Sequence, residues 1–250
     1  MIFEFSLSQV YRHFLRVESA FAQLRRLISN KSPESYQAAL LLFENLSEFL
    51  LRVDIKNELI KELEIQANHY QKLQDNPAVD KVKLDNFLNQ LKKLHHWAIN
   101  FHGKIGDSLR RDPFLSTVSS KQSLNTGVIS ADSPELAVFG FQEPVFQAQH
   151  FKRWLEMLEG LEKSVSVILR LTRELSSFTA VEAPIGDYLV DKLPSSTNLI
   201  RIKLDDKLVF PEVSASKHCA SIHFYRLDSE LRKTKFRDKI AFKIALCGWR

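Results

Sequence analysis

Four side chains near the end of the chain are of the types that bind metal ions. They are His218, Cys219, His223 and Cys247. A metal site needs its ligands to converge on one ion. Adjacent residues of a strand, such as His218 and Cys219, point to opposite faces and do not share an ion. We therefore expect no metal site and interpret these residues as polar parts of strands.

Motifs that carry catalysis in other proteins are missing from the sequence. The pattern Gly103-x-x-Gly106 lacks the third glycine of a nucleotide-binding loop, and no predicted strand precedes it. There is no GxSxG nucleophile elbow and no HExxH zinc motif. Asp205 and Asp206 are typical of a turn rather than of a catalytic acid pair. The sequence predicts a protein that is not an enzyme and needs no cofactor.

Basic side chains gather in the last quarter of the chain. The whole chain has 35 Lys and Arg against 30 Asp and Glu, a formal charge of +5. Residues 196–250 hold 12 Lys and Arg against 6 Asp and Glu, so residues 1–195 sum to about −1. Such an excess indicates an acidic partner. Nucleic acid, an anionic membrane and an acidic protein tail all meet this description.

A basic nucleic-acid-binding protein is the alternative function. Aromatic residues lie among the basic ones and would stack on bases. These are Phe224, Tyr225, Phe236, Phe242 and Trp249. The sequence has no RRM, KH or helix-turn-helix signature, which makes this function the less favoured of the two.

Arginines also line the first predicted helix, from Ser8 to about Ser29. Its apolar residues recur at steps of three and four, which places them on one buried stripe. They are Val10, Phe14, Val17, Phe21, Leu24 and Ile28. Arg12, Arg16 and Arg26 follow one flank of this stripe. They are either an ordinary solvated face or donors that bind an anionic partner.

Three further helices are predicted before residue 100. Ser32-Pro33-Glu34 is a helix start, with a capping serine, proline at the first position and an acid near the positive end. A third helix runs from about Glu58 to the break at Asn76-Pro77, and Asp80 caps a fourth. Helices in this succession predict a bundle with antiparallel neighbours.

The pattern changes twice in the second half of the chain. Residues 100–149 are rich in Gly, Pro, Ser and Thr, and within them Leu136 to Phe141 is interpreted as a strand. Helical spacing returns from Trp154 to Leu175, as one helix or as two broken at Gly160. After Phe178 apolar and polar residues alternate, which predicts an antiparallel sheet. The fold class is therefore α+β, a helical bundle followed by an antiparallel β-sheet domain.

Composition favours a cytoplasmic protein. The two cysteines lie far apart without a CxxC pattern, which fits a reducing compartment. The N-terminus lacks a basic signal-peptide region, and the longest apolar run, Ala38 to Phe43, is too short to span a membrane. We expect no membrane association.

Several short motifs, taken in order, resemble those of a known family. Ile2-Phe-Glu-Phe5, Leu15-Arg-Val-Glu18 and Asn45-Leu-Ser-Glu48 open the series. Asn57 to Leu63, Ile105-Gly-x-x-Leu-Arg110 and Phe242-x-x-Ala-x-Cys247 continue it. Together they resemble the Z-ring-associated cell-division protein D (ZapD) family over nearly the whole chain.

The resemblance implies a fold, a partner and an assembly. It implies a helical domain plus a curved β-domain, which we place at 6–115 with 147–178, and at 1–5, 128–146 and 179–250. It implies a homodimer that binds the C-terminal tail of the tubulin-like division protein FtsZ. The dimer would crosslink and bundle FtsZ protofilaments, promote Z-ring assembly at mid-cell and lower FtsZ GTPase activity.

The resemblance also implies which residues bind the tail. The family's basic positions map onto Arg16, Arg52, Arg110, Arg201 and Lys217. Where further arginines are expected, this chain has Cys219 and His223, and Pro113 and Ala137 replace polar or basic residues. We include His223 in the predicted site. Only its protonated form replaces the charge of an arginine, so we expect it to make partner binding pH-sensitive.

Overall fold

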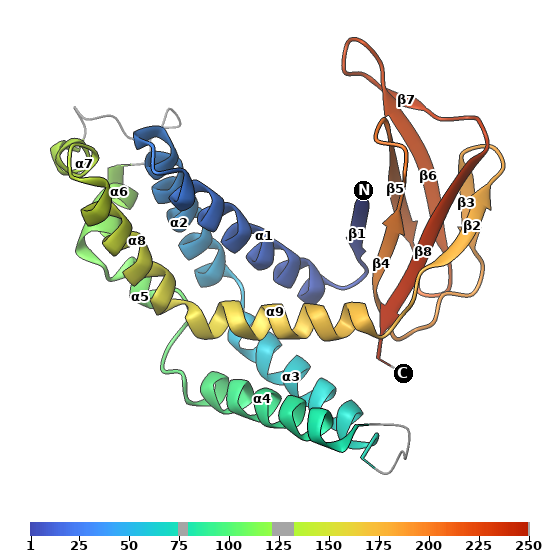
Figure 1. The fold of residues 1–250 in the computed structure, drawn as a ribbon, viewed down its shortest axis with the longest axis horizontal. Coiled ribbons are helices and arrows are strands. Elements are labelled where there is room, and N and C mark those ends of the chain that lie inside the picture. The colour runs from blue at the N-terminus through green and yellow to red at the C-terminus, as the bar shows by residue number, and fades with distance from the viewer. Residues whose placement is uncertain (75–79, 122–132, 250) are drawn as a thin grey trace. The chain divides into compact units, whose positions relative to one another are not determined.

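The computed structural model describes residues 1–74, 80–121 and 133–249 and has the predicted α+β class (Figure 1). The helices in these ranges are α1 Gln9–Asn30, α2 Pro33–Arg52, α3 Ile55–Gln71, α4 Lys81–Asn100, α5 Asp107–Arg110, α6 Pro113–Lys121, α7 Pro134–Gly140, α8 Pro144–Met157 and α9 Glu159–Glu174. The strands are β1 Ile2–Ser6, β2 Thr179–Ala183, β3 Asp187–Val190, β4 Thr197–Lys203, β5 Val209–Ala215, β6 Ala220–Leu227, β7 Lys233–Lys235 and β8 Ile240–Gly248.

The chain divides into two compact units. Residues 16–168 form the first, which we call the helical unit. Residues 1–15 and 169–250 form the second, which we call the β-unit. Helices α1 and α9 each contribute residues to both units.

Helices α2 and α4 begin where the sequence signals predicted, whereas α3 begins at Ile55 and not at about Glu58. The amide of Ser35 donates to the hydroxyl of Ser32 at the start of α2, and the amide of Lys83 donates to Asp80 at the start of α4. The predicted stripe of α1 is buried at Phe14, Val17, Phe21 and Leu24. The predicted end of the third helix, Asn76-Pro77, lies outside the described residues.

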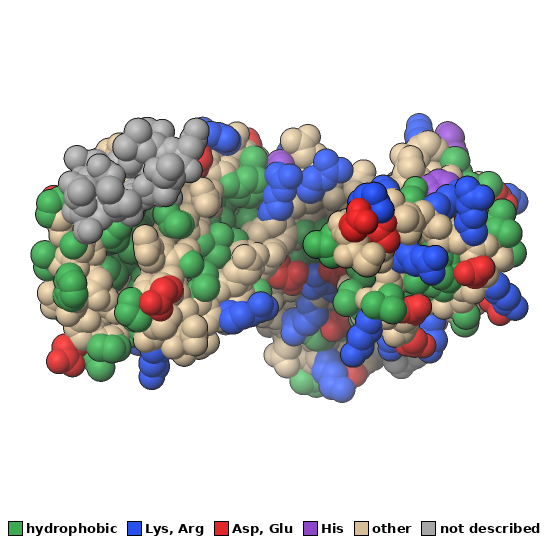
Figure 2. Space-filling model, turned by 90° about the horizontal axis from the view of Figure 1, so that it is seen from above, with side chains coloured by type: hydrophobic (Ala, Val, Ile, Leu, Met, Phe, Trp, Pro, Cys, Tyr) green, Lys and Arg blue, Asp and Glu red, His purple; other side chains and the backbone are tan. Residues whose placement is uncertain are grey.

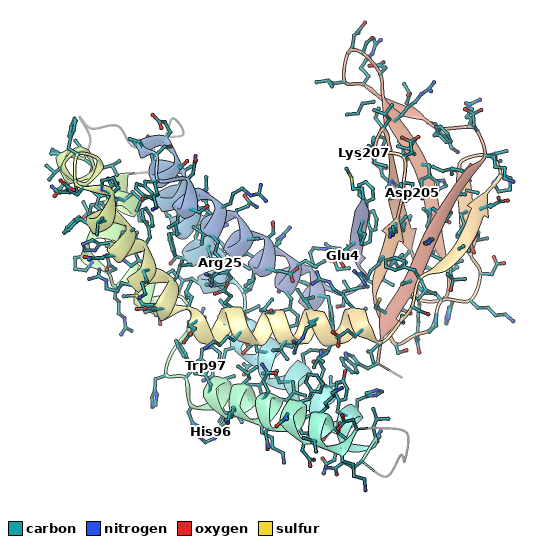
Figure 3. All side chains as sticks on the ribbon, in the orientation of Figure 1. Glu4, Arg25, His96, Trp97, Asp205 and Lys207 are labelled. Atoms are coloured by element: carbon teal, nitrogen blue, oxygen red, sulfur yellow. The ribbon has the colours of Figure 1, made fainter. Side chains whose placement is uncertain are left out.

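A break between α8 and α9 interrupts the predicted long helix. Helix α8 ends at Met157 and α9 begins at Glu159, so the break lies just before Gly160. A Cβ atom at Gly160 would lie 2.1 Å from the ring of Trp97 on α4. Only glycine therefore allows Trp97 to approach α9 this closely (Figure 3).

The prediction of a strand at Leu136 to Phe141 is wrong, because these residues form α7 and its C-cap. Ser133 caps this helix by accepting from the Leu136 amide, and Pro134 is its first residue. Six apolar residues do not distinguish a buried helix turn from a strand. Residues 133–146 belong to the helical unit. The sequence analysis places residues 128–146 in the β-domain instead. Residues 128–132 lie outside the described ranges.

Two antiparallel sheets make up the β-unit, where the sequence had predicted one. The first has the strand order β1-β4-β8-β2, and the second has the order β3-β6-β5 with β7 also paired to β6. Apolar side chains from both sheets form one core, in which the rings of Phe224 and Phe242 lie 4.9 Å apart. The opposite face of β4 carries Leu199, Arg201 and Lys203, since side chains alternate along a strand.

Candidate partner-binding site

Two of the predicted arginines lie around one aromatic ring in the helical unit. The guanidinium of Arg16, on α1, lies 5.9 Å from the centre of the Phe49 ring on α2. Arg52 follows Phe49 by three residues on α2, and residues at this spacing are neighbours on a helix surface. Arg16 and Arg52 therefore present two positive charges close to one apolar ring.

Arg52 forms an ion pair that an acidic partner can displace. It binds Glu48 one turn earlier on α2, and the two side chains are 73% and 58% exposed. Exposed pairs of this kind contribute about 1 kcal/mol or less. Exchanging Glu48 for a carboxylate of a bound partner therefore costs little.

Arg110 ends α5, a short helix held against the last turns of α2. A Cβ atom at Gly106 would lie 3.0 Å from Cβ of Leu50, and Gly106 has a φ of +106°. Lys104 donates from Nζ to the carbonyl of Leu51, at the negative end of α2. Arg110 itself is exposed. The structure thus brings Arg16, Arg52 and Arg110, which we call the helical arginines, onto elements that meet near the end of α2.

Arg201 differs from the helical arginines because it is part of an internal ion-pair network. It lies directly opposite Glu4 on the neighbouring strand and donates from Nε to Oε1 of Glu4 at 2.8 Å. Arg173 donates from Nε and Nη2 to both oxygens of the same carboxylate, at 2.8 and 2.5 Å. The Arg201 side chain is only 16% exposed. Its guanidinium is therefore engaged within the β-unit, where it shares the Glu4 carboxylate with Arg173.

Lys217 lies at the tip of the turn between β5 and β6. The hydroxyl of Ser216 accepts from the amides of His218 and Cys219, which fixes the shape of this turn. Lys217 is exposed and has no carboxylate partner in the described part of the chain. It is available to a partner from outside.

His223, on β6, belongs to a charged group of three on the second sheet. Its Nδ1 donates to Oδ1 of Asp187 at 2.6 Å, and Lys235 donates from Nζ to the other oxygen at 2.8 Å. The pKa of Asp187 lies below its ordinary value, first because of the hydrogen bond from His223 and then because of that from Lys235. The effect of His223 on partner binding stays a prediction.

The lowered pKa of Asp187 predicts a pH-dependent contribution to stability. A carboxyl group whose pKa falls on folding stabilises the fold above its unfolded pKa of about 3.9, and the contribution is lost as the pH falls through the lower folded value. We expect Asp187→Asn to cost less than about 1 kcal/mol at pH 7, because the group is partly exposed. Thermal unfolding at pH 7 and near pH 2 tests this. An equal loss of stability at both pH values would show that the Asp187→Asn change acts through its shape and not through the lost charge.

The residues considered as metal ligands do not come together. Cys247 is buried on β8 of the first sheet, and burial raises the pKa of its thiol. His218 and Cys219 lie in the β5–β6 turn of the second sheet. In the described ranges no group of three or more His, Cys, Asp and Glu side chains is arranged to hold a metal ion.

Glu4 is the structural residue that the sequence analysis missed. It neutralises one of the predicted site residues, Arg201, although the two are far apart in the sequence. The sequence offered one signal for this contact: two predicted strands of alternating residues, of which one carries Glu4 and the other carries Arg201. Without the strand pairing, that signal does not identify the partner.

Comparison with known proteins places the chain in a family. A family model described as "ZapD: Cell division protein" matches residues 15–223. The chain belongs to the ZapD family. This range includes every partner-binding residue that the sequence predicted, from Arg16 to His223. No helix in the described ranges is long and apolar enough to cross a membrane.

Relatives with the name "Cell division protein ZapD" align along their full length. The protein of Janthinobacterium sp. (strain Marseille) is 24% identical over 250 residues, covering 100% of both chains. Those of Cupriavidus pinatubonensis and Ralstonia nicotianae are 27% identical over 251 residues and 26% identical over 253 residues, again with 100% of both chains covered. Membership in the ZapD family therefore extends over the helical unit and the β-unit together.

Proposed function

We propose that this protein is a non-enzymatic cell-division factor that binds the C-terminal tail of FtsZ. It crosslinks FtsZ protofilaments into bundles, promotes Z-ring assembly and lowers FtsZ GTPase activity. It acts in the cytoplasm and is recruited to the division site at mid-cell. The observation that carries the proposal is the match to the ZapD family over residues 15–223.

The helical arginines suit a flexible acidic tail. Such a segment becomes ordered on binding, so a few charged anchors beside apolar surface are needed to hold it. Arg16 and Arg52 supply the charge, and Phe49, over which the Arg16 guanidinium lies, supplies an aromatic ring. Arg110 and Lys217 extend the set of exposed cations, while Arg201 supports the fold of the β-unit.

Crosslinking requires two tail-binding sites in one assembly. A single site occupies one filament and leaves nothing to bind a second. A two-fold homodimer carries two equivalent sites. Once one site is bound to a filament, the tails nearby are at a high effective concentration for the second site. We therefore include the homodimer in the proposed function.

Sedimentation of FtsZ polymers tests the proposal. This protein should increase the amount of FtsZ pelleted at low speed and lower the rate of GTP hydrolysis. Both effects should be lost with FtsZ that lacks its C-terminal tail. Equal bundling of intact and tail-truncated FtsZ would refute tail binding.

Charge reversal in the helical unit should weaken tail binding without unfolding the protein. We expect Arg16→Glu and Arg52→Glu each to reduce affinity for a tail peptide by about 1–3 kcal/mol, as for a charged anchor in an interface. Titration of a labelled peptide measures this. Lys163→Glu on α9 is the matched control, because Lys163 pairs with Glu159 one turn earlier on an exposed helix surface, as Arg52 pairs with Glu48. Loss of helical circular dichroism in Arg16→Glu would instead give Arg16 a structural role.

Ion pairs weaken the case for the nucleic-acid alternative. Many basic residues of the β-unit are bound to carboxylates, which breaks up a continuous positive surface (Figure 2). In the described part of the β-unit, those with a carboxylate partner include Arg173, Arg201, Arg232, Lys233, Lys235 and Lys239. A nucleic-acid binder would hold duplex DNA and lose several decades of affinity between about 50 and 200 mM salt. We expect no such binding.

A further inference from the structure

Two lysines lie next to each other on one face of the first sheet. Lys203 on β4 is directly opposite Lys243 on β8. Ile2 and Ala180 complete this row on the outer strands β1 and β2. Side chains at directly opposite positions point to the same face, with Cβ atoms about 5 Å apart, and like charges there destabilise a sheet. An anion bound between the two ammonium groups would turn this repulsion into attraction.

Both lysines line a hollow of about 240 Å³ on this face, which we call the lysine hollow. Two small side chains leave its space open. Ala180 lies opposite Lys243, and Ala241, two residues before Lys243, points to the same face. Pockets for drug-sized ligands measure roughly 300–1,000 Å³. The lysine hollow therefore has the size for one small molecule.

Neither lysine of the hollow is neutralised by a neighbouring side chain. Arg232, Lys233 and Lys235 of the same unit each form an ion pair with a carboxylate. Lys203 and Lys243 are exposed and form no ion pair in the described part of the chain. Lysine ammonium groups bind phosphate through charged hydrogen bonds. Two of them beside one hollow suit a phosphate group, which carries more than one negative charge at pH 7.

Two carboxylates also line the lysine hollow and restrict what binds there. Glu182 is bound to Lys239 at 2.8 Å. Asp205, in the loop after β4, forms no ion pair within the described residues (Figure 3). A carboxylate repels further acidic groups but accepts hydrogen bonds from hydroxyl groups, as it does from ribose in nucleotide sites. A small molecule with one phosphate and free hydroxyls therefore suits the hollow better than a strongly acidic peptide.

We propose that the lysine hollow binds a sugar phosphate. The ammonium groups of Lys203 and Lys243 hold the phosphate, and Asp205 accepts hydrogen bonds from the sugar hydroxyls. The hollow shares no residue with the predicted tail-binding set. The inference therefore goes beyond the proposed function and does not depend on it.

Isothermal titration calorimetry at constant ionic strength tests this proposal with ribose 5-phosphate, inorganic phosphate and ribose as probes. Wild-type protein should bind ribose 5-phosphate more tightly than inorganic phosphate and should not bind ribose. Lys243→Gln should weaken the binding of both phosphate probes about tenfold, the effect of losing one charged hydrogen bond. This variant should be at least as stable as the wild type, because it removes one of two like charges.

Asp205→Ala tests the sugar separately from the phosphate. It should weaken ribose 5-phosphate binding, while inorganic phosphate should bind at least as tightly because the hollow loses a negative charge. The loop should keep its shape, since the Leu208 amide donates to Asp206 and not to Asp205. Lys233→Gln is the matched control, because Lys233 is bound to Glu212 on the second sheet, and it should change neither affinity.

Four results would overturn the proposal. They are wild-type protein that binds neither phosphate probe, unchanged phosphate binding by Lys243→Gln, an equal loss in Lys233→Gln, and unchanged ribose 5-phosphate binding by Asp205→Ala. Affinity for an FtsZ tail peptide should be the same in Lys243→Gln as in the wild type. If it falls, the two lysines belong to the tail-binding site, which refutes the sugar phosphate site and leaves the proposed function intact.

Discussion

Replacement of Glu4 by Ala should destabilise the β-unit by about 2–3 kcal/mol, less than the roughly 3–5 kcal/mol for removing one partner from a fully buried ion pair, because these side chains keep some contact with solvent. The Glu4 carboxylate binds Arg173 and Arg201, and all three side chains are at most 21% exposed. Without it, the guanidinium groups of Arg173 and Arg201 lose the carboxylate that they share. Urea unfolding followed by circular dichroism measures the change.

An exposed carboxylate of the same unit provides the control for Glu4. Glu182 binds Lys239 at 2.8 Å, but the two side chains are 56% and 65% exposed. Glu182→Ala should therefore cost less than about 1 kcal/mol. Glu4→Gln should fall between the two, since the amide oxygen still accepts a hydrogen bond while the charge is lost. If Glu4→Ala and Glu182→Ala cost the same, the network around Glu4 is not structural.

The Glu4 network determines how variants of Arg201 are to be interpreted. Arg201→Glu would place a second carboxylate beside Glu4 and should destabilise the first sheet. Reduced tail binding by that variant would then follow from the loss of structure. Arg16 and Arg52, whose guanidinium groups are exposed, avoid this ambiguity. They are therefore the better residues for testing the proposed function.

Much of the helical architecture could be predicted because its signals are local. Ser32 and Asp80 cap helices through hydrogen bonds to amides three residues later, so sequence alone identifies both starts. Ser133-Pro134-Glu135 is the same signal as Ser32-Pro33-Glu34, yet the apolar run that follows it is interpreted from the sequence as a strand. The capping signal was the better guide, because it specifies one backbone conformation whereas six apolar residues fit two.

The arrangement of the site could be predicted only in part, because it depends on contacts between distant residues. Helical spacing placed Arg16 on the exposed flank of α1, as the structure has it. Strand alternation placed Arg201 on the polar face of β4, but not opposite Glu4, since register depends on strand pairing across the whole chain. Helix α7, which Gln147 of α8 binds through the carbonyl of Phe139, is interpreted from the sequence as a strand, so this contact could not be predicted.

Trp154→Ala should cost about 3–5 kcal/mol of stability in the helical unit, the usual range for a fully buried Trp. Trp154 is completely buried, with the rings of Phe43, Phe114 and Phe151 at 5.8, 6.0 and 5.4 Å. Its Nε1 has no hydrogen-bond partner in the described part of the chain. Trp154→Phe should therefore cost much less, because it removes a buried donor that was unsatisfied. Urea unfolding of both variants measures this difference.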